Sequence, residues 1–350
     1  MIVLAADMHK RSHTVAAVAA ATAELLDDRT APVGETGFRD LLEWGRGLGA
    51  ERVWALEDCR HVSGSFERFL IEHGERVVRV PTKLMAGARR ASRERGKSDR
   101  IDALAVARAA VAEGVETLPT AHLAGPELDL RLLVDHRERL IRSRVALNST
   151  LLWHLHDLWP ELEIAGSGLF YAKWHTRIAR RLARAEQSTR VRIARDELRH
   201  LHELTLSINA LEREIAHLVA ELAPHLLTEP GFGPLTVAKL LGEVAGIQRF
   251  ATDAKLARAA GVAPIPVSSG KTSRQRLDRG GNRQLNATLH RIAVTRARCH
   301  PETKAYIARK RAEGKTTREA IRCLKRHLAR QVWHLLQEPL PTGTRINLLT

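Results

Sequence analysis

The chain begins MIVLAADMHK (residues 1–10), a short apolar run that is broken by an aspartate. Ile2–Ala6 has the length and composition of a buried strand, with Asp7 at its end. Similar runs follow at 15–21, 51–56 and 76–80, and stretches with helical spacing lie between them at 36–48 and 63–73. Strands that alternate with helices predict an α/β domain with a mixed or parallel sheet. The opening run is too short, and too soon interrupted by Asp7, to be a signal peptide.

Charge is unevenly distributed along the 350 residues. Of the formal net charge of +16, residues 83–100 carry +5 and residues 268–330 carry +14, so the remainder is slightly acidic. Two basic blocks favour a partner with a phosphate backbone, although either block alone could be a solvated helix face. The aromatic content of 4% argues against base stacking as the main mode of recognition. The chain has no apolar stretch of about 18 residues and no CxxC pair, so a membrane span, a disulfide scaffold and a structural zinc site are not expected.

Four acids occupy positions where α/β sheets gather functional groups. Asp7 and Glu57 end two predicted strands, and Asp99 and Asp102 share one face at the start of a predicted helix. Carboxylates brought together repel one another and lose hydration, and a hard divalent cation such as Mg²⁺ relieves both costs. Each acid also has a structural explanation, since Asp99 could complement the helix dipole and Asp102 could pair with Arg100.

Three motifs contain these acids: ADMHK (6–10), LED (56–58) and GKSDRIDA (96–103). Together they resemble the DEDD insertion-sequence transposases, a family that includes the bridge-RNA-guided recombinases and the Piv-type DNA invertases. The resemblance implies a RuvC-like (RNase H-like) domain over residues 1–115. It also implies that the catalytic residues and ligands of Mg²⁺ or Mn²⁺ are Asp7, Glu57, Asp99 and Asp102.

Residues 126–222 contain few helix breakers and predict a long helical spacer. From Leu201 to Leu222, Leu and Ile recur at alternating steps of three and four, the a/d pattern of a coiled coil. Two long helices, 128–159 and 173–222, could pack together as an antiparallel hairpin or pair with another subunit.

A compact helical domain is expected at 226–336, followed by a tail at 337–350. The stretch PGFGPLTVAKLL (230–241) places Gly231 and Gly233 at a tight turn before a helix. Backbone N–H groups there can receive a phosphate, as in a helix-hairpin-helix element. Beyond it come a Gly-x-Ala-Pro turn (261–264), Ser268-Ser269-Gly270 and Gly281-Asn282-Arg283. In this order the motifs resemble the second domain of the same transposases. The expected fold class of the whole chain is therefore α/β plus α: a RuvC-like domain, a coiled-coil spacer and a compact all-α C-terminal transposase domain.

The resemblance implies that Ser269 is a nucleophile, with the neighbouring Ser268 as the alternative. Attack of its hydroxyl on a DNA phosphate would give a phosphoserine link and a free 3′-hydroxyl, so strands could be rejoined without a nucleotide cofactor. The family further implies donor and target DNA, a guide (bridge) RNA encoded beside the gene, and a homo-oligomer (dimer or tetramer) that exchanges strands through a Holliday junction. It implies action on nucleoid DNA in the bacterial cytoplasm and no membrane partner.

Residues beside these motifs are expected to contact nucleic acid. They are Arg89, Arg90, Arg93, Arg95 and Lys97 before the helical acids, Gly231 and Gly233 at the turn, and Lys271, Arg274, Arg276, Arg279 and Arg283 after the serine.

Two other functions fit part of the sequence. The acids alone suit a metal-dependent nuclease of the Holliday-junction type that uses water in place of the serine. The basic blocks alone suit a non-catalytic nucleic-acid-binding protein, whereas a coiled-coil adaptor would leave those blocks unexplained. No HExxH or similar metal spacing is present, so no role is assigned to any of the 17 histidines.

Overall fold

The computed structural model describes residues 1–57, 60–82, 84–85, 98–118, 120–121, 125–269, 272–276, 278 and 281–337, with the backbone alone for 60–62, 268–269 and 272–274. By internal packing the chain divides into two units. One comprises residues 1–125 and 245–282, and the other comprises residues 126–244 and 283–350. Of the predicted tail, only Gln337 lies within the described residues.

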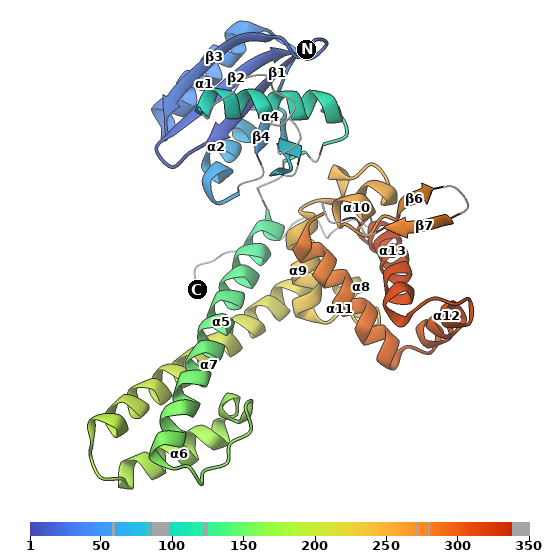
Figure 1. The fold of residues 1–350 in the computed structure, drawn as a ribbon. Coiled ribbons are helices and arrows are strands. Elements are labelled where there is room, and N and C mark those ends of the chain that lie inside the picture. Colours follow the sequence, from blue (N-terminus) through green and yellow to red (C-terminus); the bar gives the residue numbers. More distant parts are fainter. Residues whose placement is uncertain are drawn as a thin grey trace. The chain divides into compact units, whose positions relative to one another are not determined.

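A five-stranded sheet in the order β3-β2-β1-β4-β5 forms the centre of the N-terminal region (Figure 1). Its strands are β1 (Ile2–Met8), β2 (Ser12–Ala19), β3 (Leu25–Pro32), β4 (Arg52–Glu57) and β5 (Val77–Val80). β2 runs antiparallel to both β1 and β3, whereas β4 is parallel to both β1 and β5. This mixed sheet with its helices confirms the predicted RNase H-like α/β domain.

Alternating side chains of the strands supply two separate cores. Val3 and Ala5 of β1 pack on the face covered by the alanine-rich helix α4 (Asp99–Glu113). Leu4 and Ala6 pack on the opposite face, against α1 (Glu35–Leu48) and α2 (Arg60–Glu72). Because successive residues of a strand point to opposite faces, the position of a residue in β1 or β4 decides which helices it meets.

A buried ion pair ties α2 to the edge strand β5. The guanidinium of Arg79 donates from Nη2 and Nε to Oε1 of Glu67, at 2.7 and 2.9 Å. The two side chains are only 3% and 1% exposed. Removal of either partner therefore breaks an ion pair that is shielded from solvent, which is more costly than the loss of an exposed pair.

We expect Glu67→Ala to destabilise the α/β domain by about 3–5 kcal/mol, because the substitution breaks a buried ion pair and removes the acceptor of two hydrogen bonds from Arg79. Urea unfolding followed by circular dichroism measures the shift. Glu35→Ala removes the exposed ion pair with Arg39 on α1 and should change stability by only about 0.5 kcal/mol. Equal unfolding midpoints for the two variants would refute the prediction.

The second unit contains two long helices, α5 (Pro126–Leu158) and α7 (Thr189–Leu222), which pack along each other. The heptad positions Leu201, Ile208 and Ile215 are buried, so the coiled-coil pattern is satisfied within one chain. Two side-chain contacts join the helices: Arg137 of α5 donates to Glu212 of α7, and His154 of α5 contacts Glu197 of α7. Residue numbers rise along one helix as they fall along the other, so the hairpin is antiparallel.

A short helical tip interrupts what the sequence pattern predicts as one helix over 173–222. η1 (Gly168–Phe170) and α6 (Ala172–Arg184) precede α7 and lie at the end of the hairpin (Figure 1). The break falls where Ser188 caps α7 by accepting a hydrogen bond from the N–H of Val191, at 3.3 Å.

The remaining helices of this unit are α8 (Pro224–Leu227), α9 (Pro234–Val244), α11 (Arg283–Cys299), α12 (Pro301–Ala312) and α13 (Thr317–Leu335). α9 packs against α5, α7 and α11, and α13 packs against α11 and α12. The C-terminal region is thus largely helical, as predicted. None of the helices in the described part of the chain combines the length and apolarity needed to cross a bilayer.

The segment 245–282 holds η2 (Ile247–Arg249), α10 (Asp253–Ala259) and a hairpin of β6 (Ile265–Ser269) with β7 (Thr272–Arg276). In the hairpin, Ser269 pairs with Thr272. The sequence pattern does not predict this two-stranded element, because both strands have only five residues and β7 is polar throughout. An ion pair of 2.7 Å joins Arg258 of α10 to Glu113 at the end of α4.

Candidate active site

Asp7 lies near the carboxyl end of the central strand β1 and is only 5% exposed. Strand alternation places it with Val3 and Ala5, on the face that α4 covers. The hydrophobic residues before it form the middle of the sheet, so the position of this carboxylate is fixed by the core beneath it.

Glu57 is the last residue of β4, beside Asp7 on the neighbouring parallel strand. Because Ala6 is in register with Leu56, the next step along each strand brings Asp7 and Glu57 to the same level. Glu57 also follows Val53 and Ala55, which pack on the α4 side of the sheet. Register and alternation together therefore assign both acids to one face at one edge of the sheet.

The first turn of α4 supplies the other two acids. Ser98 caps this helix by accepting a hydrogen bond from the N–H of Ile101, at 3.3 Å. Asp102 is only 6% exposed, whereas the side chain of Asp99 is 55% exposed. Arg100, a proposed partner of Asp102, instead forms an ion pair with Asp28 at 2.8 Å.

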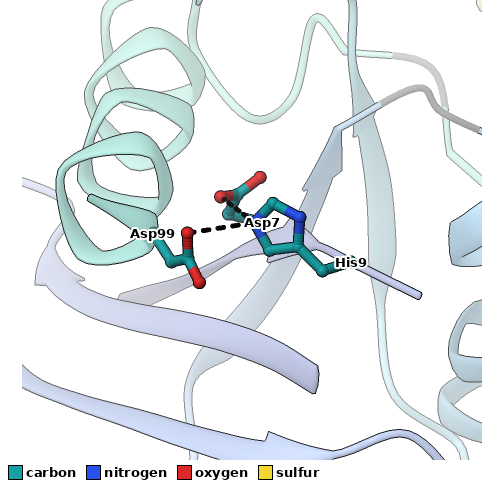
Figure 2. A group of neighbouring side chains, drawn as sticks. All are labelled: Asp7, His9 and Asp99. Carbon is teal, nitrogen blue, oxygen red and sulfur yellow. Dashed lines mark hydrogen bonds and ion pairs between the residues drawn. The ribbon is translucent and has the colours of Figure 1, made fainter. Parts of the chain in front are cut away.

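His9 joins two of the acids from different elements (Figure 2). Its Nε2 lies 3.0 Å from Oδ2 of Asp7 and 3.2 Å from Oδ1 of Asp99. No sequence motif predicts a role for this histidine. The indication available in the sequence is its position two residues after the strand-end Asp7, in the turn where the N–H of His9 donates to the carbonyl of Ser12.

The acids perturb one another electrostatically. Burial raises the pKa of Asp7, His9 lowers it, and the nearby charges of Asp102 and Asp99 raise it further, with a net upward shift. The ligand atoms of Asp7, His9 and Asp99 all lie within 4.8 Å of one another. Carboxylate oxygens and one imidazole nitrogen in such a group suit a divalent cation, which would compensate the crowded negative charge. The residues present therefore fit a divalent metal.

We expect Asp7→Asn to raise the unfolding temperature of the metal-free protein, because the substitution removes a buried negative charge that lies near Asp102 and Asp99. The raised pKa means that ionised Asp7 costs stability at neutral pH, and this cost disappears as the pH falls through that pKa. The advantage of the variant should therefore shrink on acidification. The same variant should lose the stabilisation that added Mg²⁺ gives the wild type.

Differential scanning fluorimetry with and without Mg²⁺ measures both effects. Glu24→Gln removes one exposed negative charge from the same domain and serves as the control. A variant at position 7 that is less stable without metal, and that responds to Mg²⁺ like the wild type, would argue against a metal site at this position.

The proposed serine lies in the β6–β7 hairpin, with Ser268 and Ser269 ending β6. Among its basic neighbours, Arg274 and Arg276 are in β7, and Arg276 is exposed. Arg283 is exposed at the start of α11. Several expected contact residues lie outside the described residues: Arg89, Arg90, Arg93, Arg95, Lys97, Lys271 and Arg279.

The glycine turn before α9 is held by α11. Gly231 has a φ of +85°, and a Cβ there would lie 3.3 Å from the carbonyl oxygen of Ile292. Arg296 donates from Nε to the carbonyl of Pro230 at 2.6 Å. The carbonyl of Gly233 accepts from the N–H of Thr236 at 2.8 Å, and space is open beside its Cα. Packing thus accounts for Gly231, and Gly233 is the more accessible of the two to a phosphate.

Family models of known proteins match segments in both halves of the chain. A family model described as "Transposase IS116/IS110/IS902 family" matches residues 223–308, and a DEDD transposase model of the IS110 type matches residues 4–160. The chain is similar to an uncharacterized 44.8 kDa protein of insertion element IS116 from Streptomyces clavuligerus, with 26% identity over 81% of this chain and 82% of the relative. It is also 25% identical to an uncharacterized 42 kDa protein of IS900 from Mycobacterium paratuberculosis, over 83% and 84% of the two chains. A third relative, from IS110 of Streptomyces coelicolor, is 38% identical over 39% of this chain and 33% of its own length.

Proposed function

The chain belongs to the IS110/IS116/IS900 family of transposases, with a DEDD N-terminal domain and a C-terminal domain typical of this family, and from this we propose that it breaks and rejoins DNA strands through a phosphoserine at Ser269. The observation that carries the proposal is the group of acids at one sheet edge. Asp7 and Glu57 lie at the carboxyl ends of adjacent parallel strands, and His9 contacts both Asp7 and Asp99.

The acidic group would hold Mg²⁺ or Mn²⁺, with Asp7, Glu57, Asp99 and Asp102 as the ligand acids. Such an ion, when bound, supplies positive charge that stabilises the oxygens of a phosphate undergoing substitution. His9 holds Asp7 and Asp99 in position, and burial keeps Asp7 and Asp102 from turning outward. The protein's own contribution is thus a rigid set of carboxylates that exists before DNA arrives.

The serine hydroxyl is the proposed nucleophile. The Oγ of Ser269 forms a bond to the phosphorus of a phosphodiester, its proton passes to a carboxylate of the acidic group, and the bond from phosphorus to the 3′ oxygen breaks. That oxygen takes up a proton and leaves as a 3′-hydroxyl, while the 5′ end stays on the serine as a phosphodiester. Attack by a 3′-hydroxyl from another strand reverses these steps and releases the serine, so no nucleotide cofactor is needed.

The position of Ser269 supports this role. It ends β6 at the turn of a two-stranded hairpin, and β7 beyond the turn carries Arg274 and Arg276. The hairpin belongs to the same packing unit as the acids, although the two parts are far apart in the sequence. Basic side chains beside a nucleophile can hold the phosphates that flank the reacting bond.

The partners we propose are donor and target DNA, a guide (bridge) RNA encoded beside the gene, and further copies of the chain. The family supports DNA as the polyanion, and the chain's net charge of +16 supports contact with a phosphate backbone. The RNA and a dimeric or tetrameric assembly are proposed from the family resemblance. We place the reaction on nucleoid DNA in the bacterial cytoplasm.

Trapping of a covalent adduct tests this function. The protein would be incubated with Mg²⁺, labelled DNA from the flanks of its own gene and the flanking transcript, and then denatured. We expect labelled DNA to remain on the protein and peptide mass spectrometry to locate it at Ser269. Strand cleavage without any adduct would instead favour a metal-dependent nuclease that uses water, and binding without cleavage would favour a non-catalytic protein.

A further inference from the structure

The helix α6, at the tip of the α5–α7 hairpin, carries five cationic side chains and no acid among its 13 residues. The cations are Lys173, Arg177, Arg180, Arg181 and Arg184. This concentration does not appear in the charge of the sequence block around it, because 17 acids balance 16 basic residues over 101–222. It is separate from the two basic blocks at residues 83–100 and 268–330.

The orientation of α6 follows from its apolar residues. His175, Ile178 and Leu182 are buried, and the last two join a core with Leu151, Leu198 and other residues of α5 and α7. Spacings of three and four residues put this buried stripe on one side of the helix. The remaining positions therefore face outward, and Lys173, Arg177, Arg180 and Arg184 are exposed.

The basic side chains border a hollow of about 540 Å³, which also involves Trp159 at the end of α5. Arg181 stacks over the ring of Trp159 at 4.4 Å and pairs with Glu161. Arg177 lies over Trp174 at 5.0 Å. These aromatic contacts restrict two guanidinium groups, so less side-chain entropy is lost when they meet a ligand.

Most of this charge has no acidic partner in the described part of the chain. Arg181 is paired with Glu161, whereas Lys173, Arg177, Arg180 and Arg184 form no ion pair with any described residue. By contrast, three of the five arginines on the neighbouring α7 are in ion pairs: Arg190 with Asp157, and Arg192 and Arg199 with Asp196. A surface with four cations free to bind anions is an unusual feature of an otherwise balanced hairpin.

We propose that α6 is a DNA-binding surface that holds the phosphate backbone of a duplex away from the reacting bond. From Lys173 to Arg184 the helix rises about 16 Å, at about 1.5 Å per residue. A cationic row of that length can follow several phosphates of one duplex, which carries about one negative charge per 1.7 Å of axis. The inference rests on the proposed action on DNA, since a transposase must hold duplex beyond the few base pairs at its active site.

The proposed contacts reach the backbone only, so they provide affinity without reading sequence. The arginine guanidinium suits this role because its donors can bridge two phosphate oxygens. Duplex DNA is favoured over RNA as the ligand because the matched family model is described as a transposase family, and transposition acts on DNA, whereas the guide RNA is inferred from the sequence resemblance alone.

Removal of these charges tests the proposal. The full-length triple variant Arg177→Ala, Arg180→Ala, Arg184→Ala should bind a labelled duplex about 10- to 100-fold more weakly at about 0.1 M salt. The slope of log affinity against log salt should fall by roughly 2.7, about 0.9 for each lost phosphate contact. Fluorescence anisotropy without divalent cation measures both, so the result does not depend on whether strands are cleaved.

The matched control removes three exposed arginines from α7: Arg192→Ala, Arg199→Ala and Arg213→Ala. Its loss of charge is the same, and we expect its affinity and salt slope to stay close to those of the wild type. Circular dichroism of both variants checks that the hairpin is folded. Equal weakening of the two variants, or a loss confined to a matched RNA with duplex binding unchanged, would overturn the proposal. If the α6 variant alone loses duplex binding while Ser269 forms no adduct, the binding surface stands and the covalent mechanism fails.

Discussion

Ser269→Ala is expected to abolish the covalent adduct and to slow DNA strand cleavage by at least roughly a thousandfold, the scale at which loss of a catalytic nucleophile acts. The alanine lacks the oxygen that would bond to phosphorus. DNA binding should be unchanged, because the hydroxyl contributes no charge to the interaction with the backbone. Cleavage is measured on end-labelled DNA in denaturing gels, and binding is measured by anisotropy on the same substrate.

Ser268→Ala is the matched control for this experiment. The two serines are adjacent at the end of β6 and are paired with adjacent residues of β7, so both substitutions remove one hydroxyl from the same strand. We expect Ser268→Ala to retain adduct formation. The reverse pattern would make Ser268 the nucleophile, and cleavage at full rate by Ser269→Ala would establish a water-dependent nuclease.

Asp102→Asn is expected to reduce metal-dependent cleavage by roughly 10²- to 10³-fold, because a metal site contributes several kcal/mol to stabilisation of the transition state. The substitution preserves shape in the first turn of α4, where the side chain is buried, but it removes one negative charge. It also removes a charge that raises the pKa of Asp7, so that pKa should fall. Cleavage rates across a Mn²⁺ titration, together with calorimetric titration of the metal, measure the effect.

The control for charge is Glu24→Gln, which removes one exposed acid from the same domain and should cleave DNA at the wild-type rate. DNA binding by Asp102→Asn should be as tight as that of the wild type, or tighter, since one charge that repels phosphate is gone. Normal cleavage and normal metal affinity in this variant would remove Asp102 from the proposed site. A loss of cleavage with an unfolded α4 would show only a structural role, which circular dichroism detects.

Much of the α/β domain follows from local sequence patterns. The apolar runs at 2–6, 51–56 and 76–80 correspond to β1, β4 and β5, because buried strands of a central sheet require continuous hydrophobic residues. The same pattern of apolar residues does not predict β3. It is a half-exposed edge strand with the sequence LLDDRTAP, and its position comes from pairing with β2 rather than from its own composition.

The candidate site is predictable to a different degree for each residue. Asp7 and Glu57 are indicated by their positions at strand ends, and Asp99 and Asp102 by their spacing in a helix. His9 is not, because a histidine in a turn has no periodicity that separates a site residue from a surface one. Its contacts with Asp7 and Asp99 exist only once α4 packs over β1.

By itself, the sequence determined the classes of element, the order of the motifs and the four acids, because strand periodicity and helical spacing are local properties of a chain. Only the tertiary structure decided that the heptad residues of α7 pack against α5 of the same chain, that His9 lies between two acids, and that α6 presents its cations together. The physical reason is that these three features depend on contacts between residues distant in sequence, or on which side of a helix is buried. The average composition of a segment records neither the contacts between distant residues nor the side of a helix that is buried. The net charge of residues 101–222 therefore gives no indication of the cationic surface within that segment.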